Sequence, residues 1–256
     1  MIAALRRTGV RFAILGAVAY LVFLVANLPA SWFGYALERS SGGAVALGNP
    51  RGTVWKGQGT LAVRSRDAYR GIADIEWRCN LLAVFTGRLS VALSGMAPGA
   101  NLRGNLSLGL RSVRLQNVEA SVPVALIGPA VPIAAIAKPE GRLRVVADSF
   151  EIGSASVNGA ATVDWAEAGL SGVARVGDYR LQITGSGERA DVRLSTLRGD
   201  LRVNGNGEWR ASEPRVVRMR GVAEISPGRT DLEPLLQLAA GQGAGISRPF
   251  EWMLAI

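Results

Sequence analysis

The chain has 256 residues, no histidine, a single cysteine and a formal net charge of +9. Without histidine, Ser-His-Asp and Cys-His catalysis and His-ligated zinc are excluded, and Cys79 alone cannot form an intramolecular disulfide. The positive charge is almost all arginine, and the arginines recur singly between apolar residues. This spacing is typical of solvated strand faces. We therefore expect no nucleic-acid partner, cofactor or metal, and keep membrane lipid as an alternative partner.

An uncharged segment runs from Phe12 to Leu37 near the N-terminus. About 20 apolar residues in a helix are enough to cross the ~30 Å hydrocarbon core of a bilayer. The sequence therefore predicts a transmembrane anchor over residues 12–30. A cleaved signal peptide is the alternative, but cleavage after Ala30 would place Leu28 where a small residue is needed, and the apolar run is longer than that of a typical signal. An uncleaved anchor is favoured.

Basic residues in front of this segment predict its orientation. Three arginines precede it: Arg6, Arg7 and Arg11. Positive charge marks the cytoplasmic side, so residues 1–11 are expected in the cytoplasm and the bulk of the chain beyond the membrane. Two aromatic residues suit a belt at the outer membrane interface: Trp32 and Tyr35.

From Val45 onward, apolar and polar residues alternate with a period of two, as in strands with one face on a core and the other in water. The pattern is clear in residues 89–93, 106–110 and 201–203. Glycines interrupt it at intervals and indicate turns or bulges. We predict a β-domain over residues 45–256.

The β-domain divides into two blocks of similar outline, residues 45–120 and 141–226. Each has short strands, frequent glycine and a tryptophan after an acidic residue, which predicts two halves of one continuous antiparallel sheet. The apolar segment 122–139 between them is rich in proline, and we expect a crossover with a short helix or an apolar loop.

Helical spacing returns near the C-terminus. Thr230 and Glu233 fit a capping box, and the following leucines predict a short amphipathic helix over Asp231–Ala240, ended by Gly241. The predicted fold class is thus mainly β: an N-terminal transmembrane helix, then a long twisted antiparallel sheet or sandwich, with a short C-terminal helix.

A distinctive motif lies early in the β-domain, where threonine, valine and tryptophan suit a strand and the flanking glycines permit a bulge or a close backbone approach. Its residues are Gly52, Thr53, Val54, Trp55 and Gly57. A phosphate-binding loop is excluded, because the motif lacks the required glycine-lysine spacing and no helix follows it.

Taken in order, five segments resemble protein N of the bacterial type II secretion system. They are Leu28–Trp32, Gly52–Gly59, Ile75–Leu93 and the stretches Gly177–Leu181 and Leu201–Gly207. The resemblance implies an accessory, single-pass protein of the inner membrane with a periplasmic β-domain. It also implies contacts with other inner-membrane secretion components, and it assigns a catalytic role to no residue of this sequence.

Three functions compete at this point. The first is an accessory secretion component that acts through protein-protein contacts of its β-domain. The second is an AsmA-like module that handles lipid or another apolar ligand, because the same alternation could line an open groove. The third, an enzyme, is disfavoured: Lys56 and Lys138 lie outside any recognisable Ser-x-x-Lys frame, and the carboxylates alternate as outward strand residues. The sequence leaves the oligomeric state open.

Overall fold

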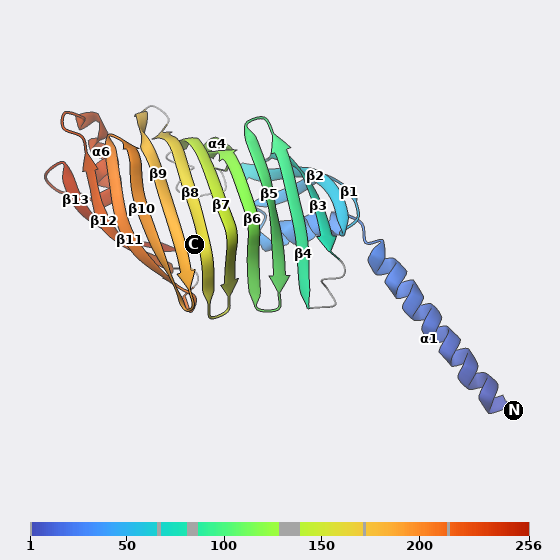
Figure 1. Ribbon diagram of the computed structural model, residues 1–256. Helices are drawn as coiled ribbons and strands as arrows, with labels where there is room; N and C mark the ends of the chain where they lie inside the picture. Colours follow the sequence, from blue (N-terminus) through green and yellow to red (C-terminus); the bar gives the residue numbers. More distant parts are fainter. Residues whose placement is uncertain are drawn as a thin grey trace.

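The computed structural model shows a long, curved β-sheet with a helix projecting from one end (Figure 1). It describes the chain over residues 2–65, 68–80, 87–127, 139–170, 173–213 and 216–255.

A single antiparallel sheet of 13 strands contains every strand of these ranges, and the strands lie side by side in chain order. The sheet is therefore a continuous meander that joins both sequence blocks. Its strands are β1 (Val45–Gly52), β2 (Lys56–Ser65), β3 (Ala68–Asn80), β4 (Arg88–Ala97), β5 (Ala100–Gly109), β6 (Ser112–Pro123), β7 (Pro139–Gly153), β8 (Val157–Leu170), β9 (Val173–Ser186), β10 (Arg189–Gly199), β11 (Leu201–Arg210), β12 (Val216–Ile225) and β13 (Ser247–Ala255).

Helices lie mainly at the two ends of the sheet. They are α1 (Ile2–Ala26), α2 (Ser31–Ser40), α4 (Val124–Ile127), the 3-10 helix η2 (Thr230–Leu232) and α6 (Glu233–Ala240). Within the predicted crossover, α4 follows β6 directly, and residues 128–138 lie outside the described residues.

The predicted fold class needs one correction, at the N-terminus. Over the residues that the structure describes, no helix is both long enough and apolar enough to cross a membrane, so the predicted transmembrane helix over residues 12–30 is wrong. Helix α1 stops at Ala26. Its uncharged part, from Phe12, is therefore about 22 Å long at ~1.5 Å per residue, short of a ~30 Å hydrocarbon core.

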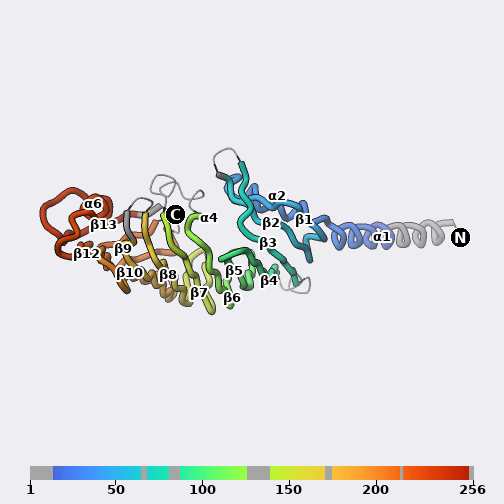
Figure 2. Tube along the Cα trace, turned by 90° about the horizontal axis from the view of Figure 1, so that it is seen from above, coloured from blue at the N-terminus to red at the C-terminus, as the bar shows by residue number. Residues whose placement is uncertain are grey.

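The two-residue alternation gives the sheet an apolar inner face and a polar outer face. Cross-strand partners share a face, as where Trp77 lies opposite Leu93 and Leu93 opposite Gly104. Seen from above, the sheet curls at both ends, with α2 beside β1 and β2 at one end and α6 beside β12 and β13 at the other (Figure 2).

Two separate apolar clusters hold this curved sheet. The larger joins β7 to β13 and takes in Leu232 and Leu236, which are fully buried. The smaller lies at the other end, around Trp77 on β3 and Phe33 on α2. Burial of apolar surface is the main force in folding, so the sheet is held at its two ends by helices packed on its inner face.

At the C-terminal end the helix is present, but the predicted capping box is not. Leu232 occupies the N-cap of α6 and makes no side-chain cap bond. Glu233 instead accepts a hydrogen bond from Arg248 of β13, a residue only 5% exposed. The Arg248 guanidinium also donates to the carbonyls of Gly241 and Gly245, both at 3.2 Å. One buried cation therefore fastens α6 to the last strand.

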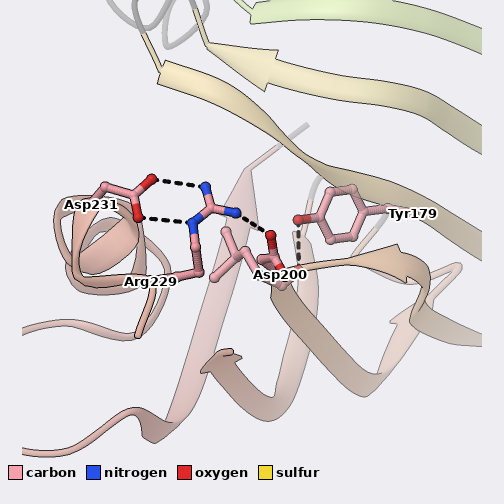
Figure 3. A network of polar contacts seen from close by, with 5 residues as sticks. Tyr179, Asp200, Arg229 and Asp231 are labelled. Carbon is pink, nitrogen blue, oxygen red and sulfur yellow. Dashed lines mark hydrogen bonds and ion pairs between the residues drawn. The ribbon is translucent and has the colours of Figure 1, made fainter. Parts of the chain in front are cut away.

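A second polar network fixes the approach to this helix (Figure 3). Arg229 donates two hydrogen bonds of 2.8 Å to the carboxylate of Asp231 and pairs with Asp200. The hydrogen bond from Arg229 holds the pKa of Asp231 below its usual value. Nearby, the Tyr179 hydroxyl donates to the carbonyl of Leu201 at 2.8 Å, and burial raises the pKa of Tyr179.

Candidate functional site

The sequence motif forms the tight turn between β1 and β2. Gly52 lies opposite Gly57, and the Thr53 amide donates to the carbonyl of Lys56 at 2.9 Å. Gly52 has φ +93°, and a Cβ there would lie 2.5 Å from the Lys56 carbonyl oxygen. Only glycine is compatible with both the dihedral angle and the close approach.

The same turn holds the segment that connects α1 to α2. The Val54 amide donates to the carbonyl of Leu28 at 2.9 Å, and the Ala30 amide donates to the carbonyl of Gly52 at 3.1 Å. The Trp55 indole donates to the carbonyl of Val25 at 2.8 Å, within the last turn of α1. These bonds take up backbone groups at the end of α1, which explains why the helix stops there.

Trp77 supports the turn from the inner face. Its indole donates to the Val54 carbonyl at 3.0 Å, and its ring stacks on Phe33 of α2 with 4.7 Å between centroids. Cys79 lies beside it, with Sγ 3.3 Å from the same carbonyl oxygen. Burial raises the pKa of the Cys79 thiol, which makes it a poor nucleophile. This part of the site is structural.

On the outer face beside the turn, the sheet is hollowed over a volume of about 800 Å³. Strands β1 to β6 contribute to this outer hollow. Its lining includes two motif glycines, Gly52 and Gly57. Its charged residues are four cations and one carboxylate: Arg51, Lys56, Arg78, Arg103 and Glu76. The outer hollow therefore carries net positive charge.

Strand register explains how these residues meet. Lys56 on β2 lies directly opposite Arg78 on β3, and Arg78 lies opposite Ala92 on β4. In the next row, Ser94 on β4 lies opposite Arg103 on β5. Ala92 therefore lies between Arg78 and Asn105, and Ser94 lies between Glu76 and Arg103. These two small side chains leave room above the middle of the site.

Over the part of the chain that the structure describes, none of the four cations of the outer hollow forms an ion pair. Within the described residues, all ion pairs are formed by residues of the sequence range 114–248. Examples are Arg114–Glu151 and Arg180–Asp164, both at 2.6 Å. Glu119, the cross-strand neighbour of Arg103, instead pairs with Arg144 at 2.7 Å. Strands β1 to β5, which carry the four cations, thus form no ion pair among the described residues.

The residues predicted from the sequence have different outcomes. The five motif residues come together in the β1–β2 turn. Trp32 and Tyr35 lie on α2 and are 60% and 59% exposed, and their place at a membrane interface stays a prediction. Arg6, Arg7 and Arg11 fall within α1, where the structure describes no side chains, so their role in orientation stays a prediction too.

The outer hollow was missed by sequence reasoning. Its cations are far apart in the chain and each has the alternating spacing of a solvated strand residue. The one available signal was local: acidic residues are scarce between Val45 and Arg111, whereas arginines are frequent there. Only the strand register brings these arginines to one place.

Together, the fold and site define a protein built on a long one-layer β-sheet with a cation-lined hollow. Among the described residues, no group of side chains is suited to hold a metal ion. The chain belongs to the family of type II secretion system protein N, whose family model matches residues 43–247. The resemblance seen in the sequence is thereby confirmed, and with it an accessory role in type II secretion. No curated protein and no solved structure matches the chain.

Proposed function

We propose that this protein acts in type II secretion through protein-protein contacts of its sheet with other components of the inner-membrane machinery. One observation carries this proposal: the outer hollow presents four cations that form no ion pair among the described residues, within the part of the chain that matches the family. Complementary charge steers association and fixes register between proteins. A sheet fastened at both ends offers a firm surface for such a contact.

Within this proposal, the sheet lies on the periplasmic side of the inner membrane. The position is what the resemblance to the family implies for its β-domain. Protease added to spheroplasts should then degrade the sheet while cytoplasmic proteins stay intact. Protection of the sheet in intact spheroplasts would contradict the position without bearing on the contact itself.

Site-specific photo-crosslinking in cells tests the contact. A photo-reactive residue at Ser94, in the outer hollow, should give a crosslink to another secretion component. The matched control is Arg193, which lies on the outer face of β10 and away from the hollow. Crosslinks of equal yield from both positions, or normal secretion in a strain that lacks the protein, would contradict the proposed function.

An AsmA-like role in lipid handling is the second candidate, and one observation favours it. Leu108 and Val113 lie opposite each other on β5 and β6, between the two apolar clusters, and are 38% and 39% exposed. A photo-reactive residue at Val113 that recovers phospholipid, with no protein crosslink from Ser94, would favour this candidate over the first.

A further inference from the structure

We infer that the outer hollow binds an acidic segment of a partner protein. The inference deepens the proposed function and rests on it, because it states the chemistry by which another secretion component is recognised.

The first observation is a pair of like charges. Lys56 and Arg78 are directly opposite on neighbouring strands, and neither forms an ion pair within the described residues. Like charges at this spacing repel and destabilise a sheet. Glu76, opposite Gln58 in the next row, forms no ion pair with either cation within the described residues. A bound carboxylate between the two cations would replace their repulsion with two attractions.

The second observation is the width of the outer hollow. Measured across the sheet, Lys56 on β2 and Arg103 on β5 are three strand spacings apart, roughly 14 Å at ~4.8 Å each, and they are offset by two residues along the strands. A single phosphate group is too small to reach both sides. In an extended peptide, two side chains four residues apart on the same face are also about 14 Å apart at ~3.4 Å per residue. Two carboxylates at that spacing match the two cationic sides.

The third observation is the chemistry between the cations. Gln58, Asn105 and Asn117 line the hollow and carry amide groups that can both donate to and accept from a peptide backbone. The hollow lies on the polar face of the sheet. Of its apolar lining residues, Trp77 and Leu93 belong to the inner-face cluster, and Ala92 adds only a methyl group. An acyl chain would have little surface to bury here, so a peptide is favoured over an anionic lipid.

Binding of a defined probe to the purified full-length chain tests this inference. The probe is a fluorescent peptide of about ten residues with two glutamates four positions apart and serines elsewhere, and a matched peptide carries glutamines instead. We expect the glutamate peptide to bind, and to bind more weakly as salt rises. The Lys56→Gln/Arg78→Gln variant should lose about tenfold in affinity.

The variant is designed to keep its fold. Removing two like charges relieves repulsion, so its thermal midpoint should stay the same or rise by about 1–2 °C. The matched control is Arg193→Gln/Arg220→Gln, which neutralises two arginines of the same face, both facing Asn206 on β11. We expect the control to bind the peptide as the unchanged chain does.

Three outcomes would overturn the inference: no binding of the glutamate peptide, equal binding by the hollow variant and the unchanged chain, or preferential binding to vesicles of phosphatidylglycerol and phosphatidylcholine. A cell experiment separates this result from the proposed function. If loss of the protein impairs secretion but the hollow variant restores it fully, the inference fails and the function stands. If loss of the protein leaves secretion normal, the proposed function fails.

Discussion

At the scale of single residues, Trp77 connects three separate segments of the chain. It is 2% exposed, and it joins β3, the motif turn and α2 through one hydrogen bond and one ring stack. These segments are distant in sequence, so Trp77 converts the local shape of the turn into a fixed position for α2. The motif is therefore structural: its residues form the turn that positions α2 against the sheet.

Replacing Trp77 should be far more costly than replacing an exposed tryptophan. We expect Trp77→Ala to lower the free energy of unfolding by about 3–5 kcal/mol, through the cavity it leaves and the loss of buried apolar surface. The matched change Trp32→Ala, at a side chain 60% exposed, should cost less than about 1 kcal/mol. Denaturant unfolding measures both, and equal losses would show that the N-terminal cluster contributes little.

At the scale of elements, α6 illustrates how a short helix is held in place by its surroundings. Eight residues of helix are marginal by themselves, and packing must supply the stability. Leu232 and Leu236 bury one side, and Arg248 satisfies the carbonyl of Gly241 just beyond the helix end. The Trp252 indole adds a hydrogen bond of 2.7 Å to the carbonyl of Ala239.

Arg248 should therefore behave as a structural residue despite its charge. We expect Arg248→Ala to lower the free energy of unfolding by about 2–3 kcal/mol, because Glu233 and two carbonyls lose their donor. The control Arg202→Ala removes an exposed partner of Glu224, 3.9 Å away, and should cost less than about 1 kcal/mol. Urea unfolding followed by tryptophan fluorescence distinguishes the two, and a neutral Arg248→Ala would contradict this role.

At the scale of the whole molecule, the absence of histidine determines how stability responds to pH. The pKa values of Glu151, Glu208 and Asp231 are lowered in the folded protein, chiefly by hydrogen bonds from Arg114, Arg210 and Arg229. A lowered pKa stabilises the fold fully above the unfolded value, near ~4, and that contribution is lost as pH falls through the folded value. The pKa values of Cys79 and Tyr179 are raised by burial, so their contributions are lost as pH rises above ~8.5 and ~10 respectively.

We therefore expect a flat stability profile between about pH 5.5 and 8, with losses outside that window. The midpoint of urea unfolding, measured at constant ionic strength across the range, checks this expectation. A step in the midpoint between about pH 6 and 7 would require a titrating group that the sequence does not contain, and would contradict it.

Much of the sheet could be predicted from the sequence, because a period of two in residues such as Leu89, Val91 and Leu93 is a local signal. The end of α1 could not, since it depends on bonds from Val54 and Trp55 to the backbone before Pro29. The capping box failed for a similar reason: Asp231 and Glu233 are engaged by Arg229 and Arg248. For α1 the cause is the β1–β2 turn, and for the capping box it is the two arginines. Neither can be predicted from the local pattern alone.

The candidate site also has one part that could be predicted from the sequence and one part that could not. The motif residues were visible because they are consecutive and chemically unusual. The outer hollow was not, because Lys56, Arg78 and Arg103 become neighbours only after the register of β2 to β5 is known. Register depends on the whole hydrophobic pattern and on the turns, so a cross-strand site is harder to read from a sequence than a loop site.

The order of the strands has a consequence for how the molecule is made. Each strand pairs only with the strands before and after it in the chain, so no strand must wait for a distant part of the sequence. Loops that close over short distances lose little entropy, and proteins dominated by such closures assemble quickly. A chain that becomes available from its N-terminus onward can therefore add one strand after another to the sheet, in sequence order. Helix α6 packs last, against β12 and β13.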